Sequence, residues 1–303
     1  GSQAVGMGVA LAEAFPVARH LFQEVDDALS QKLSALMAEG PESELTLTEN
    51  AQPALMAVSL AVVRVLESEG GLDLASAGAF VAGHSLGEYS ALAAAGTFSV
   101  ADTARLLKIR GQAMQKAVPV GVGAMAALLG AELDLAREIA AEAAQGEVCE
   151  AANDNGGAQV VVSGHKGAVE RAMALAAQRG VKRAVPLPVS APFHCALMQP
   201  AADAMAEALE GVAMAAPRLP LVANVTAQSV VDPAQIRELL VRQVTGTVRW
   251  RESVLFMKAQ GVTTLVELGA GKVLGGLAKR IDKDLAGLSV GTPADVESFL
   301  KSL

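Results

Sequence analysis

Aromatic side chains are scarce in this sequence. Phe, Trp and Tyr together make up 3% of its 303 residues, so alanine, valine, leucine and ten methionines must fill the interior. Charged residues are also few, at 18%, whereas 52% of the residues are hydrophobic, and this combination excludes a disordered chain. We therefore expect one large core, or one core and a smaller satellite domain, with small-faced helices packed closely on a sheet.

Cysteine and excess basic charge are lacking as well. The only two cysteines, Cys149 and Cys195, show no CxxC or His-rich spacing, which excludes a disulfide framework and favours a reducing compartment. The net charge of −8 argues against nucleic acid as a general partner, although a local basic patch for an acidic protein stays possible. We expect a cytoplasmic protein.

Long hydrophobic runs are missing too. The most apolar stretch, residues 53–66, is interrupted by Ser59 and Arg64 and falls short of the ~20 residues that a membrane span requires. No basic segment followed by an apolar one opens the chain, so the sequence shows no secretory signal. We expect no membrane association.

The spacing of apolar residues predicts an alternation of helices and short strands. In the first part of the chain the expected helices are residues 16–37, a run from Pro53 closed by Gly70 and Gly71, 86–95 and 100–117, with one buried strand at 79–82. Toward the C-terminus they are 200–209, 233–243 and 254–259, with strands at 221–224 and 264–268 and a glycine-rich turn at 269–271.

The middle of the chain has a different pattern. Strands are expected at residues 124–129, 148–152, 159–163 and 184–189, and helices at 133–144 and 167–179. This β-α-β-β-α-β order is typical of a ferredoxin-like subdomain. We therefore predict an α/β main domain formed by residues 1–120 and 190–303, with a ferredoxin-like subdomain at 121–189 inserted in it.

The sharpest local motif is a GxSxG sequence, Gly83-His84-Ser85-Leu86-Gly87, between a predicted strand and a predicted helix. Flanking glycines tolerate the tight turn of a nucleophile elbow, which lifts the serine hydroxyl clear of the backbone. The Leu86 amide would begin the following helix, where unpaired N–H groups favour an oxyanion. A chance glycine-serine turn is the alternative, and the strand-turn-helix placement makes it the weaker one.

A serine nucleophile needs a base, and the chain has four histidines. His20 falls on an amphipathic helix, His84 adjoins the serine and His165 begins a helix of the inserted segment, which favours surface, structural and capping roles. His194 lies in the loop where the inserted segment rejoins the main domain, and such a junction borders a cleft. By elimination, His194 is the best candidate base.

Two hydrolase families do not fit. An α/β-hydrolase places its histidine last, after the acid, near the C-terminus, and no histidine follows His194. A patatin-like lipase pairs its serine with an aspartate of an Asp-Gly motif, and the sequence contains no Asp-Gly dipeptide.

At these residues the chain resembles the malonyl-CoA:acyl carrier protein transacylases, the discrete acyltransferases of bacterial type II fatty-acid synthesis. The matching segments span nearly the whole chain in order: residues 83–91, 110–115, Asn153 with Asn155, 159–165, 191–198 and 266–274. The resemblance implies an α/β fold with a hydrolase-like core, a parallel sheet and the ferredoxin-like insertion. The family also opens with a strand and a turn whose glutamine amide completes the oxyanion hole, and this sequence matches only the end of that turn, at residues 1–3.

The resemblance also implies roles for single residues. Ser85 would be the nucleophile and His194 the general base, oriented by a backbone carbonyl of the stretch 247–250, for which we favour Arg249. Arg110 would clasp the free carboxylate of malonyl, because a planar guanidinium meets a carboxylate through two parallel hydrogen bonds. Leu86 and Phe193 resemble the malonyl-selective pattern, in which bulky side chains crowd the space of an α-methyl group.

The implied partners are malonyl-CoA and acyl carrier protein, with no metal or bound cofactor, and the enzyme would be a monomer. Because the chain and an acyl carrier protein are both acidic, docking requires a local basic patch. Two basic pairs match places where the family docks its carrier: Lys182 with Arg183, and Lys279 with Arg280. Ordinary solvated surface charge is the alternative for each of these residues.

Three other functions stay open. A trans-acting acyltransferase of a polyketide synthase shares these motifs and would use malonyl or methylmalonyl groups. A hydrolase that removes stray acyl groups is the second, and a catalytically silent subunit that docks a carrier protein is the third. The intact set of Ser85, His194 and Arg110 argues against silence.

Overall fold

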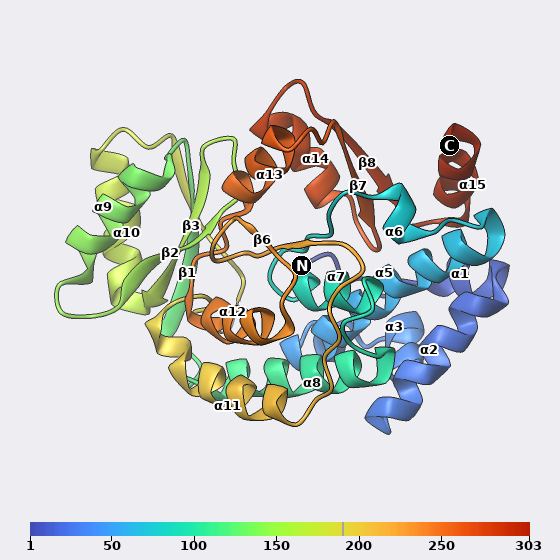
Figure 1. Ribbon diagram of the computed structural model, residues 1–303. Helices are drawn as coiled ribbons and strands as arrows, with labels where there is room; N and C mark the ends of the chain where they lie inside the picture. The colour runs from blue at the N-terminus through green and yellow to red at the C-terminus, as the bar shows by residue number, and fades with distance from the viewer. Residues whose placement is uncertain (190) are drawn as a thin grey trace.

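The largest sheet of the protein is four-stranded and antiparallel. The computed structural model describes residues 1–189 and 191–303. The strands are β1 (Gly123–Leu129), β2 (Cys149–Asp154), β3 (Gln159–His165) and β4 (Arg183–Pro186), in the order β2-β3-β1-β4. Helices α9 (Leu133–Ala144) and α10 (Lys166–Gln178) pack against one face of this sheet (Figure 1). All six elements lie within two residues of their predicted starts, and the prediction for β4 runs three residues past its end.

The two faces of this sheet have different neighbours, because successive side chains of a strand point to opposite faces. Val160 and Val162 of β3 belong to the core formed with α9 and α10. Val161, between them, packs on the other face in a small cluster that includes Phe193. The sheet therefore adjoins the loop that carries His194.

Helices form most of the remaining structure. Before the sheet they are α1 (Val9–Ala14), α2 (Pro16–Leu29), α3 (Leu33–Glu39), α4 (Glu42–Leu45), α5 (Thr48–Gly70), α6 (Leu74–Ala77), α7 (Gly87–Ala94) and α8 (Val100–Lys116). After it come the 3-10 helix η1 (Ala196–Met198) and α11 (Gln199–Glu210), α12 (Pro233–Thr245), α13 (Trp250–Ala259), α14 (Val273–Ile281) and α15 (Pro293–Ser302). Most of their buried faces share one large core, in which α2, α5 and α8 all contact one another. The buried residues of α13 and α14 form a separate cluster.

Three predicted helices differ from the observed ones, and one of them, α13, begins four residues before its predicted start at residue 254. The expected helix at residues 16–37 is divided into α2 and α3, because Ser30 takes the left-handed conformation, with φ 48°, and ends α2. Helix α5 begins five residues before Pro53, so this proline lies inside the helix. By length and composition α5 is the one helix of the described residues that could cross a membrane, but 72% of its apolar window is buried within the protein, as in a core helix.

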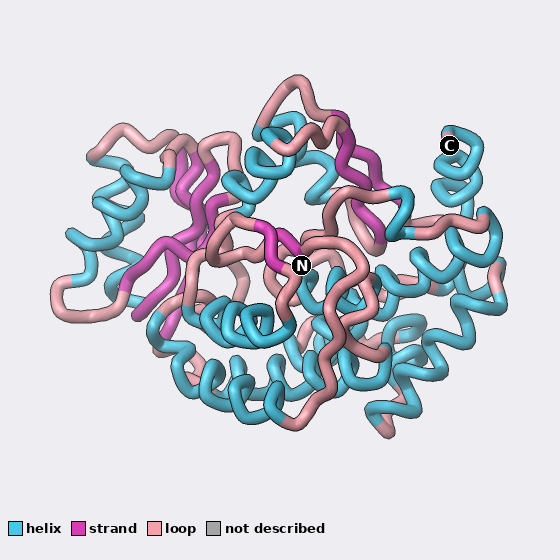
Figure 2. Tube along the Cα trace, viewed as in Figure 1, coloured by secondary structure: helices cyan, strands magenta, loops and turns pink. Residues whose placement is uncertain are grey.

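The parallel sheet expected in the main domain is small. Among the described residues, the parallel pairing consists of β7 (Thr264–Leu268) with β8 (Ala286–Val290) and of two isolated bridges, one joining Val81 to Leu221 and one joining Asn153 to Val248. The predicted strand at 79–82 is thus reduced to a single bridge, and β5 (Leu221–Val222) instead pairs antiparallel with β6 (Ser229–Val230). Figure 2 shows these short strands apart from the four-stranded sheet.

Helix α14 and strand β8 were not predicted, because glycines interrupt their apolar patterns. Gly287 of β8 lies directly under α14, and a Cβ there would be 2.1 Å from the Gly275 carbonyl oxygen. The close approach of helix and strand therefore requires glycine.

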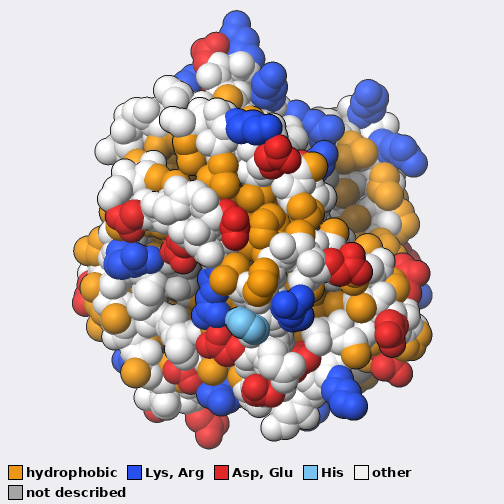
Figure 3. All heavy atoms as spheres, turned by 90° about the vertical axis from the view of Figure 1, so that its right-hand side faces the viewer, with side chains coloured by type: hydrophobic (Ala, Val, Ile, Leu, Met, Phe, Trp, Pro, Cys, Tyr) orange, Lys and Arg blue, Asp and Glu red, His pale blue; other side chains and the backbone are white. Residues whose placement is uncertain are grey.

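Charges of both signs share the face of the molecule that carries α2 and α15. Acidic and basic side chains are both scattered over it (Figure 3). Lys and Arg side chains are most frequent along its upper edge, and hydrophobic side chains gather below them (Figure 3). This upper edge is at the height of α13 and α14 in Figure 1.

Candidate active site

Ser85 lies in a sharp turn just before α7. Its backbone has φ 54°, in the left-handed region that non-glycine residues rarely adopt. The turn is tight, since a Cβ on Gly83 would lie 1.9 Å from the Gly87 carbonyl oxygen. The GxSxG motif therefore forms the elbow expected from the sequence, with α7 beginning at Gly87.

The Ser85 hydroxyl contacts His194. The distance from Ser85 Oγ to His194 Nε2 is 2.8 Å, and the histidine is 4% exposed. Its other ring nitrogen, Nδ1, lies 2.9 Å from the carbonyl oxygen of Gln243 and 3.2 Å from that of Gly246. A carbonyl only accepts hydrogen bonds, so Nδ1 carries the proton and Nε2 is free to accept from the serine hydroxyl.

The expectation that the Arg249 carbonyl orients the histidine is wrong. Arg249 is the N-cap residue of α13, and its carbonyl accepts from the amide and the hydroxyl of Ser253 in the first turn of that helix. Gln243 instead lies in the last turn of α12, where backbone carbonyls lack partners within the helix. Position near the end of a predicted helix was the one sequence feature that could have pointed to Gln243.

Burial keeps His194 neutral. Burial, together with the nearby positive charge of Arg110, lowers the pKa of His194 to about 3. The carbonyls of Gln243 and Gly246 act the opposite way but do not offset burial. At neutral pH the imidazole is therefore unprotonated at Nε2, the state that a general base needs.

Arg110 reaches the same hydroxyl from α8. Its Nη2 donates to Ser85 Oγ at 3.1 Å and to Gln243 Oε1 at 2.7 Å, and its Nη1 donates to Gln52 Oε1 at 2.8 Å. The side chain is 1% exposed, and its guanidinium carbon lies 5.7 Å from the centre of the Tyr89 ring. The two glutamines that hold it were not singled out from the sequence.

Glycine next to this arginine allows α8 to approach α5. A Cβ on Gly111 would lie 2.4 Å from the Cα of Glu49. This contact brings Gln52, on the following turn of α5, within reach of Arg110. The Arg-Gly pair of the sequence motif thus has a packing reason as well as a chemical one.

Leu86 and Phe193 are half-buried beside the two central residues. Leu86 follows Ser85 and packs against the main core. Phe193 precedes His194 and packs between the main core and the four-stranded sheet. Both bulky side chains therefore belong to the surroundings of the Ser85–His194 pair.

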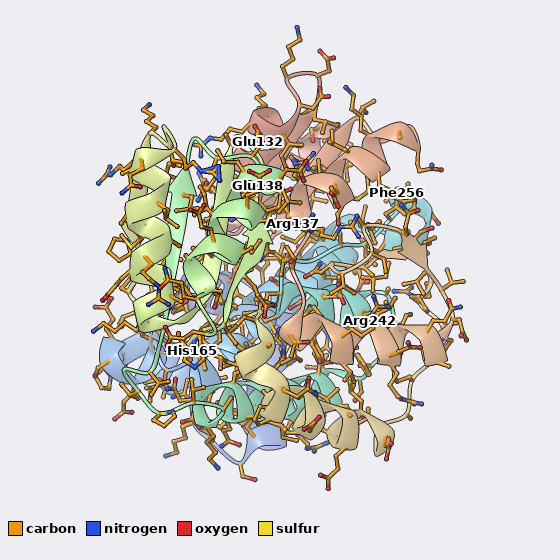
Figure 4. The ribbon with its side chains drawn as sticks, turned by 90° about the vertical axis from the view of Figure 1, so that its left-hand side faces the viewer. Glu132, Arg137, Glu138, His165, Arg242 and Phe256 are labelled. Atoms are coloured by element: carbon orange, nitrogen blue, oxygen red, sulfur yellow. The ribbon has the colours of Figure 1, made fainter. Side chains whose placement is uncertain are left out.

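The other histidines lie elsewhere. His84 Nε2 is 2.8 Å from Asn155 Oδ1, its ring centre is 5.8 Å from that of Trp250, and burial lowers the pKa of His84. His20 is exposed on α2. His165 is the N-cap residue of α10 and accepts from the Val148 amide, and Figure 4 shows it apart from Arg242 on α12.

The two basic pairs border one loop. Lys182 packs over Gly130, since a Cβ added to this glycine would lie 3.1 Å from the Lys182 Cβ. Arg280 packs over Gly157 in the same way, with a distance of 3.3 Å to its Cβ. Gly130 in turn donates to the Ala158 carbonyl at 2.7 Å, so both pairs adjoin the loop 155–158. All four basic side chains, including those of Arg183 and Lys279, are exposed, and among the described residues none of them forms an ion pair.

The groups that an acyl-transfer site needs meet at one hydroxyl. They are a serine at a strained elbow, a neutral histidine and a buried arginine. The chain belongs to the family of the acyl transferase domain, whose model matches residues 1–280. The relatives that carry a more particular name are malonyl CoA-acyl carrier protein transacylases. That of Escherichia coli (strain K12) is 46% identical over 301 residues, covering 99% of this chain and 96% of the relative. That of Bacillus subtilis (strain 168) is 43% identical over 304 residues, covering 100% and 94%.

Solved structures agree with this family. An acyl-carrier-protein-S-malonyltransferase from Bartonella henselae is 59% identical, with a TM-score of 0.97, and the match covers 100% of this chain and 96% of that one. A malonyl-transacylase solved in complex with a type II PKS acyl-carrier protein is 45% identical, with a TM-score of 0.96 and coverage of 100% and 97%.

Proposed function

We propose that this protein transfers the malonyl group of malonyl-CoA to the phosphopantetheine thiol of an acyl carrier protein, through a malonyl ester of Ser85. The observation that carries the proposal is the position of Ser85 Oγ, 2.8 Å from a neutral imidazole nitrogen and 3.1 Å from a guanidinium nitrogen. The names of its relatives support the substrate and the carrier. Fatty-acid biosynthesis is the corresponding pathway, and a polyketide synthase is the alternative.

The reaction has two matched halves. In the first, His194 Nε2 takes the Ser85 proton while Oγ attacks the thioester carbonyl, and the oxyanion is stabilised by the Leu86 amide at the N-terminus of α7. The thiolate of CoA leaves with the proton that His194 returns. In the second half, His194 takes the proton of the carrier thiol, the thiolate attacks the malonyl ester, and Ser85 regains its proton. The carbonyls of Gln243 and Gly246 keep the imidazole in the required tautomer throughout.

The fold that supports this chemistry is a hydrolase-like core with a ferredoxin-like subdomain. The strand order β2-β3-β1-β4 and the separate core under α9 and α10 support an inserted unit at residues 121–189. The remaining segments, 1–120 and 190–303, share the large helical core. Residue 190, the predicted boundary, lies outside the described residues. A monomer in the cytoplasm that binds no nucleic acid stays a prediction.

Label transfer tests the function. The protein is mixed with radiolabelled malonyl-CoA, with and without holo-acyl carrier protein, and the label is followed on protein, carrier and free malonate. We expect a labelled enzyme without carrier and a labelled carrier when it is added. Release of free malonate at the same rate with and without carrier would favour a hydrolase, and no label on either protein would favour a silent docking subunit.

Arg110 is proposed to hold the malonyl carboxylate beside Ser85, while Leu86 and Phe193 crowd the space of an α-methyl group. We expect Arg110→Ala to lose malonyl loading and to favour acetyl-CoA relative to the wild type, because no other described cation touches the Ser85 hydroxyl. Loading rates with malonyl-CoA and acetyl-CoA measure this preference. Arg105→Ala, at an exposed position of the same helix, is the matched control. A retained malonyl preference in Arg110→Ala would show that another residue binds the carboxylate.

The two basic pairs are proposed to dock the acidic carrier protein beside the loop 155–158. Reversing the charges of Lys182, Arg183, Lys279 and Arg280 should raise the apparent KM for the carrier and leave loading from malonyl-CoA nearly unchanged. The wild-type carrier reaction should also weaken with added salt, which screens exposed charges. Reversal of the exposed Arg19 and Lys301, on α2 and α15, serves as the control. Equal damage to both half-reactions would show that the four residues hold CoA or the fold instead.

A further inference from the structure

The buried side-chain amide of Asn224 binds the backbone on both sides of the elbow without contacting the reacting atoms. Asn224 follows β5 and is 0% exposed. Its Oδ1 accepts from the Ser85 amide at 2.8 Å, and its Nδ2 donates to the Gly83 carbonyl at 2.8 Å. One side chain therefore bridges the backbone before and at the serine.

Asn224 is itself held by two neighbours. Its backbone amide donates to Glu88 Oε2 at 2.7 Å, and this carboxylate, in the first turn of α7, is 1% exposed. Gln243 Nε2 lies 3.3 Å from Asn224 Oδ1 and donates to the Ser85 carbonyl at 2.8 Å. The elbow is thus connected to α7 and to α12, the helix whose Gln243 carbonyl orients His194.

The elbow needs such support. Ser85 is held at a positive φ, and a strained backbone persists only where its surroundings over-determine it. The expected strand before the elbow supplies little, since in the described part of the chain the only pairing of residues 79–82 is the Val81–Leu221 bridge. Backbone hydrogen bonds from Gly87 to His84 and from Glu88 to Ser85 close the turn itself. Its further support comes from side chains, and Asn224 makes two of those contacts.

We propose that Asn224 is a positioning residue that places Ser85 Oγ in line with His194 Nε2 by holding the Ser85 amide and the Gly83 carbonyl together. The inference rests on the proposed function, in which Ser85 is the group that becomes acylated. Asn224 acts through the backbone of the elbow and contacts neither the hydroxyl nor Arg110.

The alanine variant measures the size of the effect. Asn224→Ala removes both contacts, so we expect kcat for malonyl transfer to fall by about 10²-fold, as a small misplacement of a reacting group can cause. The KM for malonyl-CoA should change little, because the contacts of Arg110 stay in place. Asn50→Ala is the matched control, since Asn50 is also buried and donates to a backbone carbonyl, that of Glu44, away from the elbow. This control should affect thermal stability and leave kcat unchanged.

The aspartate variant separates positioning from simple packing. Asn224→Asp keeps the size of the side chain, but an ionised carboxylate cannot donate to the Gly83 carbonyl, whereas a protonated one can donate to it and still accept from the Ser85 amide. Burial should keep this carboxyl protonated to higher pH than usual. Activity of Asn224→Asp, relative to wild type at each pH, should therefore rise as pH falls from about 9 to about 5.5. The Asn224→Ala ratio should stay flat.

Other titratable groups face the same turn. Dividing the activity of each variant by that of wild type at the same pH removes the pH dependence that these groups give to both proteins. These groups are Glu88 on α7, whose pKa burial raises to about 8, Arg110 on α8, and the two histidines His84 and His194. Each is present in wild type and in both variants. The pH dependence specific to Asn224→Asp therefore arises from the new carboxyl group, either directly or through its effect on the titration of neighbours such as Glu88.

Two results would overturn the inference while leaving the proposed function standing. One is wild-type kcat in Asn224→Ala together with normal labelling of Ser85. The other is a pH-independent ratio for Asn224→Asp, which would show that Asn224 only fills space. If Asn224→Ala proves unfolded by circular dichroism, the Asn224→Asp pH profile alone decides. Failure of wild-type protein to become labelled at Ser85 would instead overturn the proposed function.

Discussion

Replacing Ser85 with alanine is expected to abolish the covalent malonyl adduct. The hydroxyl at the elbow is the group on which His194 and Arg110 converge, and alanine leaves both without a nucleophile between them. Incubation with malonyl-CoA followed by intact-protein mass spectrometry measures the adduct, and peptide mapping locates it. We expect one adduct on wild-type protein, at Ser85, and none on the variant.

Ser90→Ala is the matched control for this experiment. Ser90 belongs to the same sequence motif but is buried within α7, and its replacement should leave the adduct at the wild-type level. A malonyl adduct on Ser85→Ala, mapped to another side chain, would refute the assignment of the nucleophile. Labelling in the presence of carrier protein checks that the adduct is an intermediate, since it should disappear as the carrier is loaded.

Replacing His194 with alanine is expected to slow acylation by on the order of 10²–10⁴-fold, the usual contribution of general acid–base catalysis, while the fold stays intact. The reason is that Ser85 Oγ loses its only described proton acceptor among the side chains. Stopped-flow release of CoA measures the rate, and circular dichroism checks the fold. Near-normal turnover would point to His84, the half-buried histidine that precedes Ser85.

The pH dependence of the wild-type enzyme follows from the same residue. Burial lowers the pKa of His194 to about 3, far below the usual value of about 6.5, so the imidazole stays unprotonated as the pH falls below neutrality. Protonation of this base should therefore not limit the loading rate in weakly acidic solution. The lowered pKa also makes folding stability depend on pH. The contribution of neutral His194 to the free energy of unfolding is fully present above the unfolded pKa of about 6.5, and it is lost as the pH falls toward the folded pKa of about 3.

Much of the fold could be read from local patterns. The six elements within residues 121–189 were predicted with small errors, because the apolar residues of this segment have a clear period and glycines separate most of its elements. The prediction of a single helix at residues 16–37 was wrong because the backbone of Ser30 leaves the helical region. The spacing of the apolar residues around Ser30 does not reveal this change. The parallel sheet was overestimated because a buried apolar run indicates burial and says little about how many strand partners it finds.

The sequence by itself determined which chemical groups the site contains. Ser85, His194 and Arg110 stand in recognisable motifs, because a tight turn, a proton acceptor and a buried cation each require particular residue types. The tertiary structure alone decided how they are held: the carbonyl of Gln243, rather than that of Arg249, orients His194, and Asn224 secures the elbow. Every residue carries a backbone carbonyl, so the sequence does not distinguish one from another. Only the packing of α12 against the elbow brings a carbonyl of its last turn, one that accepts no hydrogen bond from within the helix, beside the imidazole.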